Sequence, residues 1–187
     1  MARQGDNRRS REAAKTVICH LLAANGGSMR GKVRLNKAFY FAHLYYWRDS
    51  SGVLTDYPIV RLPNGPCIDD ASDLLAELET DGAISITVGR AGPRTEYSYR
   101  LQRDWTFDPD SSDGKAIMSA IEFVDDRTAA EPSAFTHEHS RSWQTTPNGQ
   151  EMDIYIDLID EDEFERMRKG VAEIRDREKA IWPLTGN

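Results

Sequence analysis

Apolar positions recur at helical spacing in two segments near the start of the chain. Between residues 10 and 25 they are Ala14, Val17, Ile18, Leu21 and Leu22, with Ser10 as the expected N-cap and Gly26-Gly27 as the stop. In "VRLNKAFYFAHLYYWR", residues 33–48, apolar side chains fall on nearly every side of the predicted helix. A helix that is apolar all round is normally buried, so we expect this one at the centre of the fold.

The pattern then changes from a helix to two alternating runs. The turn signal "LPNGPC" precedes a third predicted helix, at about residues 70–81, with Ala71, Leu74, Leu75 and Leu78 on one face. Around the Gly/Pro loop "GRAGPR", apolar and polar residues alternate, and the apolar ones are Ile84, Ile86, Val88, Tyr97, Tyr99 and Leu101. This alternation predicts a β-hairpin. Three helices followed by a hairpin is the element order of a winged helix.

The second half of the chain predicts more helices. After the polar stretch "DPDSSDG", a fourth helix carries Ile117, Ala120, Ile121 and Val124 at helical spacing. Thr128–Glu131 has the pattern of a capping box and opens a short fifth helix, near the end of which lies Trp143. The segment "MDIYIDLI" alternates and predicts a strand or an extended segment. A second capping pattern at residues 160–163 precedes a long helix that ends at Pro183.

The predicted fold is therefore mainly α with a small β-hairpin, in a compact helical domain. We expect residues 1–9, which are polar and basic, to be disordered and residues 10–187 to form a single domain. Within that domain, residues 10–102 form a half that resembles a winged helix. Residues 110–182 form a C-terminal helical part with a long C-terminal helix.

Composition supports a soluble cytoplasmic chain. The 187 residues are 39% hydrophobic and 29% charged, and no apolar run approaches the roughly 20 residues that span a bilayer. The first fifteen residues lack the apolar core of a signal peptide. Cys19 and Cys67 are far apart and have no C-x-x-C spacing, so we expect two buried free thiols rather than a disulfide or a zinc ligand pair.

The net charge of −7 is unevenly distributed. Ser28–Arg48 holds five basic residues and no acid, whereas Glu151–Glu163 holds seven acids and no base. One face could meet an anion and the other a cation, although two solvated faces explain the pattern equally well. The third predicted helix is acidic and has no base, which disfavours its entry into a DNA groove. If the chain binds DNA, then Arg90, Arg94 and Arg100 of the wing or the basic run 30–37 must contact it.

The stretch "SAFTHEHSRSW" raises the question of a metal site. In a helix, His137 and His139 diverge by about 200°, so they could share a metal only in an extended segment. The spacing H-E-x-x-H is absent, as are a nucleophile motif and a phosphate-binding loop. We therefore expect no catalytic residues, no metal and no cofactor. A metalloenzyme that uses His137 and His139 remains the alternative.

Three segments together resemble the Panacea domain, also called the SocA-like antitoxin domain. They are "RLNKAFYFAHLYYW", "PIVRLPNGPCIDDASDLLAELETDG" and "SAIEFVDDRTAAEPSAFTHEHSRSW", and the resemblance covers roughly Val33 to Trp143. The matching motif positions are Leu35, Lys37, Tyr40, Phe41, Ala42, Gly65, Pro66, Thr136, His137 and Trp143. Two positions depart from the family pattern: Pro63-Asn64 stands where a Lys-Tyr pair is common, and Ser142 stands where a proline often precedes the tryptophan.

This resemblance implies an antitoxin of a toxin–antitoxin system, of bacterial or phage origin, that binds and neutralises a cognate protein toxin. Two alternatives remain: a winged-helix transcriptional regulator that binds DNA, and an adaptor that delivers a toxin to a protease. A nucleic acid is the less favoured partner, and no membrane contact is expected.

The residues divide into two predicted groups. Aromatic and arginine side chains anchor protein interfaces, which points to Tyr40, Tyr45, Tyr46, Trp47 and Arg48 for partner binding, with packing in the core as the alternative for most of them. The motif adds Lys37, Gly65 and Pro66 to this set. The structural group of the motif comprises Leu35, Phe41, Ala42, Thr136, His137 and Trp143.

Overall fold

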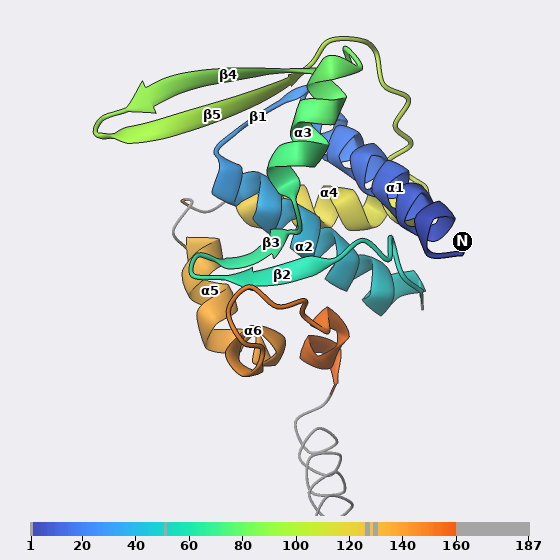
Figure 1. The fold of residues 1–187 in the computed structure, drawn as a ribbon, viewed down its shortest axis with the longest axis vertical. Coiled ribbons are helices and arrows are strands. Elements are labelled where there is room, and N and C mark those ends of the chain that lie inside the picture. Colours follow the sequence, from blue (N-terminus) through green and yellow to red (C-terminus); the bar gives the residue numbers. More distant parts are fainter. Residues whose placement is uncertain (1, 51, 126–127, 129–130, 160–187) are drawn as a thin grey trace, which may run out of the picture.

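The computed structural model describes residues 2–50, 52–125, 128 and 131–159. Its helices are α1 (Ala2–Ala24), α2 (Lys32–Ser50), α3 (Ala71–Thr80), α4 (Ser112–Asp125), α5 (Glu131–His139), α6 (Arg141–Thr145) and the 3₁₀ helix η1 (Ile154–Leu158). The strands are β1 (Ser28–Arg30), β2 (Ile59–Leu62), β3 (Gly65–Ile68), β4 (Ile84–Ala91) and β5 (Arg94–Leu101). The expected mainly α fold with a small β component is confirmed (Figure 1). The long C-terminal helix that we expected lies outside the described residues.

Helix α2 occupies the centre of the molecule. Nine consecutive residues, Leu35–His43, are buried, which is the result expected for a helix that is apolar on nearly every side. Helices α1 and α4 pack along it, α5 and η1 also contact it, and α6 lies between α5 and η1 in the chain (Figure 1). Helix α1 begins at Ala2 rather than near the expected N-cap Ser10, so residues 2–9, which we expected to be disordered, form part of it.

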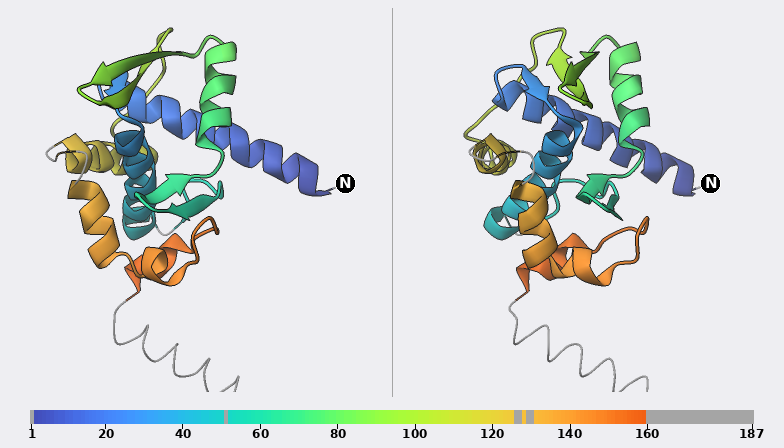
Figure 2. Two further views of the ribbon diagram at one scale, coloured as in Figure 1. Left: turned by 60° about the vertical axis from the view of Figure 1, so that its left-hand side comes forward. Right: turned by 90° about the vertical axis from the view of Figure 1, so that its left-hand side faces the viewer.

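The hairpin has the register that the alternation predicts. Ile84 pairs with Leu101, Ile86 with Tyr99 and Val88 with Tyr97 in the antiparallel strands β4 and β5. The short strand β1, which we did not predict, pairs with β5, and the sheet order is β1-β5-β4. Ile84 and Tyr99 are buried, whereas Val88 is 64% exposed. The outer half of the hairpin therefore projects away from the helices (Figure 2).

The expected turn "LPNGPC" is the turn of a second hairpin, β2–β3. Its strand β2 also pairs on its other edge with residues 149–152, through the amide of Gly149 to the Arg61 carbonyl (2.8 Å) and the amide of Met152 to the Ile59 carbonyl (2.8 Å). The segment "MDIYIDLI" is only partly extended. Glu151 forms a bridge with Val60, and the chain then turns into η1, because the Asp153 side chain accepts the amide of Tyr155 and caps that helix.

Candidate functional site

The motif residues, which come from three distant parts of the sequence, meet inside the molecule. Lys37 of α2 is 1% exposed, and its ammonium lies against the turn at Gly65 and donates a long hydrogen bond to the Pro66 carbonyl (3.5 Å). Gly65 has φ +100°, and a Cβ added there would overlap the Lys37 Nζ and lie 2.8 Å from the Thr136 Oγ1. Only glycine lets these three elements approach so closely.

Burial gives Lys37 an unusual pKa. Desolvation lowers it from 10.5 to about 8, because no carboxylate of the described residues forms an ion pair with the amine. The Lys37 charge in turn helps to lower the pKa of His137, after the larger effect of burial. The thiol of Cys67 donates to the Gly65 carbonyl (3.5 Å), and burial raises its pKa.

Trp143 closes this cluster from outside. Its ring stacks on His137 (centroids 4.0 Å apart, planes at 19°), and the Arg61 guanidinium lies 4.3 Å from the ring centroid. The indole Nε1 donates to the Leu62 carbonyl (3.0 Å), and Arg61 Nε donates to the Trp143 carbonyl (2.8 Å). The tryptophan therefore fastens the C-terminal part of the domain to the β2–β3 hairpin. It lies in α6, a helix that we did not predict, whose N-cap is Ser140.

The two histidines of the motif stretch point to different neighbours. His137 faces Trp143, whereas the ring of His139 lies 4.6 Å from that of Phe135. Within the part of the chain that the structure describes, no three His, Cys, Asp or Glu side chains gather in a way that could hold a metal ion. In that same part, none of the helices has both the length and the apolar character needed to cross a membrane.

A second polar cluster forms around Asp157 of η1, which the sequence did not single out. Its Oδ2 accepts the hydroxyl of Tyr40 (2.6 Å) and that of Ser140 (2.8 Å), and its Oδ1 accepts the amide of Ser142 (2.8 Å). The pKa of Tyr40 is well above 10, first because the phenol is buried and then because of the nearby Asp157 carboxylate. Asp157 thus joins α2, α6 and η1.

The predicted partner-binding set is divided between the interior and the surface. Lys37, Tyr40, Gly65 and Pro66 are buried and serve packing, so another chain could not reach them in this structure. The structural group is also buried or nearly so: Leu35, Phe41, Ala42 and Thr136 are buried, and His137 and Trp143 are half-buried. Tyr45 and Tyr46 are half-buried, and Trp47 and Arg48 are exposed at the C-terminal end of α2.

The surface residues of α2 adjoin η1. Trp47, 39% exposed, packs on Tyr155 with ring centroids 4.6 Å apart, and the guanidinium of Arg48 lies 4.9 Å from the Tyr45 ring centroid. Leu158 is also exposed beside a hollow that it lines with Trp47 and Arg48. We call Tyr45, Tyr46, Trp47, Arg48, Tyr155 and Leu158 the aromatic surface.

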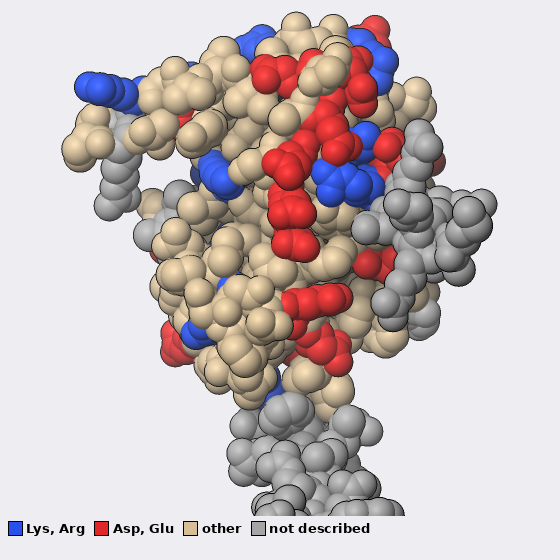
Figure 3. Space-filling model, viewed as in Figure 1, with Lys and Arg blue, Asp and Glu red and all other residues tan. Residues whose placement is uncertain are grey.

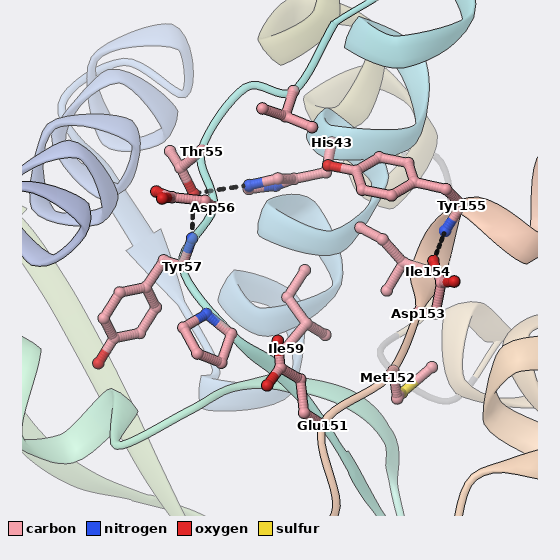
Figure 4. A pocket seen from close by; sticks show the side chains of 12 residues that line it. His43, Thr55, Asp56, Tyr57, Ile59, Glu151, Met152, Asp153, Ile154 and Tyr155 are labelled. Atoms are coloured by element: carbon pink, nitrogen blue, oxygen red, sulfur yellow. Dashed lines mark hydrogen bonds between the residues drawn. The ribbon is translucent and has the colours of Figure 1, made fainter. Parts of the chain in front are cut away.

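A groove of about 470 Å³ opens next to the aromatic surface. One wall is the loop Val53–Pro58, the other is Glu151–Tyr155, and His43 and Ile59 lie between them (Figure 4). The Met152–Ile59 hydrogen bond ties the walls together at the base. Exposed carboxylates stand on both walls: Asp56 on one, Glu151 and Asp153 on the other. We call this the acidic groove.

His43 forms the floor of the groove and is not free to react. Its Nδ1 donates to the Phe39 carbonyl (2.8 Å), which leaves Nε2 to accept the Thr55 hydroxyl (2.9 Å). Burial lowers the pKa of His43 to about 4, so the imidazole is neutral at physiological pH. On the groove wall, burial raises the pKa of Tyr155, and the carboxylates of Asp153 and Asp56 raise it further.

Comparison with known proteins gives one match. Residues 35–144 match the family model described as "Antitoxin SocA-like, Panacea domain". No curated protein and no solved structure matches the chain. The matched range includes the buried motif cluster and the first wall of the acidic groove, whereas its second wall, residues 151–155, follows the match.

Proposed function

The chain belongs to the SocA-like antitoxin family that is defined by the Panacea domain, and on this premise we propose that it is an antitoxin that neutralises a protein toxin by direct contact. One observation carries the proposal. Most of the motif residues are buried and pack against one another, whereas the aromatic surface and the acidic groove are accessible to another protein. Exposed aromatic and arginine side chains next to a hollow are typical of protein interfaces. On this view the protein acts by binding and has no catalytic step of its own.

Co-expression with the product of the adjacent open reading frame tests this function. We expect the chain to rescue growth from that product and to co-purify with it. The Trp47→Ala variant should weaken the complex at least tenfold, because a tryptophan at the centre of an interface commonly contributes about 2 kcal/mol or more. Tyr97→Ala is the matched control, since Tyr97 is 37% exposed on the distant hairpin against 39% for Trp47.

If both variants bind the toxin as tightly as the wild type, the aromatic surface is not the interface. If no adjacent gene product is toxic or is bound, the antitoxin function itself is refuted. The protease-adaptor alternative is separated by the lifetime of the toxin in cells. An adaptor shortens it, whereas an antitoxin that acts by occlusion leaves the toxin stable within the complex.

A second candidate function is DNA binding through the winged-helix-like half. The order of α1, β1, α2, α3 and the β4–β5 hairpin, with β1 paired to β5, is consistent with a winged helix. Arg30 pairs with Ser98, and Arg100 pairs with Ser28. Paired residues point to the same face of a sheet, as do residues two apart in one strand, so the exposed Arg30 and Arg100 lie on the same face. Acidic side chains, in contrast, gather over α3, the helix that would enter the major groove (Figure 3).

This candidate predicts a salt-dependent shift of the protein's own promoter DNA that is lost on Arg30→Ala/Arg100→Ala. The absence of binding at about 50 mM salt would remove it, because electrostatic binding to phosphates is strongest at low salt.

A further inference from the structure

We propose that the acidic groove is the receptor for a single cationic side chain, foremost an arginine, projecting from the protein partner. This inference rests on the proposed function, since it names the chemistry by which that partner is recognised. The groove shares Tyr155 with the neighbouring aromatic surface, but its carboxylates lie outside that surface, and the inference can fail by itself.

The first observation is the charge of the groove. Asp56, Glu151 and Asp153 are exposed on its two walls, and within the described residues none of them forms an ion pair. Some other acids do have a basic partner: Glu77 binds Arg11 (2.6 Å) and Lys15 (3.2 Å), and Asp125 binds Arg34 (3.0 Å). Exposed acids such as Asp104, Asp110 and Glu122 have no ion pair among the described residues either, but they do not line the groove. The groove therefore presents negative charge that the described chain does not neutralise.

The second observation is the proximity of the two walls. Asp56 and Asp153 belong to segments almost a hundred residues apart, yet both line the same groove, one on each wall, and both carboxylates add to the effect of burial in raising the pKa of Tyr155. A cationic side chain in the groove would therefore lie between two walls that each carry an exposed carboxylate. Two flanking carboxylates suit a guanidinium well, because its five N–H groups lie in one plane and can donate in several directions.

The third observation is the apolar lining. Ile59, Met152 and Ile154 are buried along the base of the groove, and Val53, at its edge, is 50% exposed. A cationic side chain has an apolar stem as well as a charged head, and it can cover apolar surface while the head reaches polar groups. The apolar side chains offer no ligand atoms to a divalent metal ion, and the three carboxylates would repel an anionic ligand.

The fourth observation concerns rigidity. The backbone bond from Met152 to Ile59 and the Val60–Glu151 bridge fix the two walls to each other, and the His43–Thr55 bond anchors the first wall to α2. The groove is therefore formed before any partner arrives. A preformed receptor loses little conformational entropy on binding, which favours a measurable affinity even for a small fragment.

The test uses the whole protein and a defined probe, N-acetyl-L-arginine amide, followed by the backbone amide NMR shifts of residues 151–155. N-acetyl-L-citrulline amide is the control probe, since it has nearly the same shape without the charge. We expect saturable shifts with a Kd on the order of 1 to 10 mM for the arginine probe, and at least fivefold weaker binding of citrulline.

Matched variants locate the effect. Asp56→Asn/Glu151→Gln/Asp153→Asn removes the three charges, and the amide side chain introduced at position 153 keeps an oxygen that can accept the amide of Tyr155. Asp104→Asn/Asp110→Asn/Glu122→Gln changes the net charge equally at exposed positions elsewhere. We expect the first variant to bind the arginine probe at least fivefold more weakly and the second to bind it like the wild type.

The inference is overturned if the arginine probe gives no saturable shift, if citrulline binds as well, or if both triple variants bind alike. The same variants distinguish it from the proposed function. A toxin that binds the groove variant with unchanged affinity refutes the arginine receptor and leaves the antitoxin function intact. Conversely, probe binding in a protein that captures no adjacent gene product supports the receptor and refutes the antitoxin function.

Discussion

Lys37 and Gly65 form a contact that leaves no free volume. The ammonium occupies the space that a Cβ at position 65 would need, and Gly65 adopts a φ of +100° that other residues rarely tolerate. Substitution at either position therefore affects the other. The pair also explains why a charged residue is found among nine consecutive buried positions of α2: its amine fills the hollow that the glycine leaves.

We predict that Gly65→Ala lowers the free energy of unfolding by more than the roughly 1 to 2 kcal/mol that an unfavourable φ costs a non-glycine residue. The excess comes from displacement of the Lys37 amine. In a Lys37→Ala background, Gly65→Ala should lower the free energy of unfolding only by the cost of the unfavourable φ angle. Urea denaturation of the four proteins of this double-mutant cycle measures the difference, and an equal cost in both backgrounds would show that the amine does not obstruct the site.

The lowered pKa of Lys37 predicts a dependence of stability on alkaline pH. Between its folded value of about 8 and its ordinary 10.5, the unfolded chain holds a proton that the folded chain has released. Stability relative to Lys37→Met should therefore rise with pH across this window, by up to about 3 kcal/mol. Below pH 8 the difference should be constant, and a flat difference across the whole range would contradict the desolvated amine.

His43 predicts the corresponding effect in acid. Its pKa of about 4 in the folded protein lies below its ordinary 6.5, so between these values the unfolded chain binds the extra proton. Wild-type stability should fall by up to about 3 kcal/mol as the pH decreases from 6.5 to 4. His43→Asn, which keeps a donor for the Phe39 carbonyl, should lack this loss in thermal unfolding measured over the same range.

At the scale of elements, the spacing of apolar residues correctly predicted the longer helices and the β4–β5 hairpin, whose form depends mainly on neighbouring residues. The buried faces of α3 and α4 and the register of β4 with β5 follow from the spacing of apolar residues such as Leu74, Ile117 and Tyr99. The short elements β1, β2, β3, α6 and η1 were not predicted, because three to five residues carry too little periodicity. They exist through tertiary bonds, for example from the amide of Gly31 to the Tyr97 carbonyl (2.8 Å).

The site was predictable to a similar extent. The motif positions were identified in sequence, but their division into interior and surface was not, because a lysine and a tyrosine in an aromatic helix fit an interface as well as a core. Asp157 gave no local signal, since its partners Tyr40 and Ser140 come from other segments. A face that meets a cation was one of two interpretations of the acidic run 151–163, and it stays a prediction; Glu151 and Asp153 of that run line the groove.

We predict that Asp157→Ala loosens α6 and η1 together. It removes three hydrogen bonds and leaves the buried Tyr40 hydroxyl without its acceptor, which should cost about 2 to 4 kcal/mol. Hydrogen exchange at residues 140–145 should accelerate with the loss of unfolding free energy. Asp153→Ala is the control, because it loses only the 3.3 Å cap of η1, worth about 1 kcal/mol. Equal effects of the two variants would contradict a central role of Asp157.

At the scale of the whole molecule, charge is unevenly distributed, although the acids of α3 and its C-cap also meet Arg11 and Lys15 of α1. The sheet carries exposed arginines, α3 and the groove carry carboxylates, and the net charge is −7. Charge of one sign accelerates the approach of a partner of the other sign. The association rate with a basic partner should therefore fall by about tenfold or more between about 0.05 and 0.5 M salt, as stopped-flow measurements can show. A rate that does not change with salt would argue against electrostatic recognition.

Residues 149–152 pair along β2, and this pairing joins two segments of the chain into one groove. One half comes from the segment that defines the family, and the other comes from residues beyond position 144. A homologue could thus keep the interior that maintains the fold and acquire a new binding preference by altering only the downstream stretch. If the groove recognises the partner as we propose, exchanging the segment after position 144 between two members of the family should change which partner is bound.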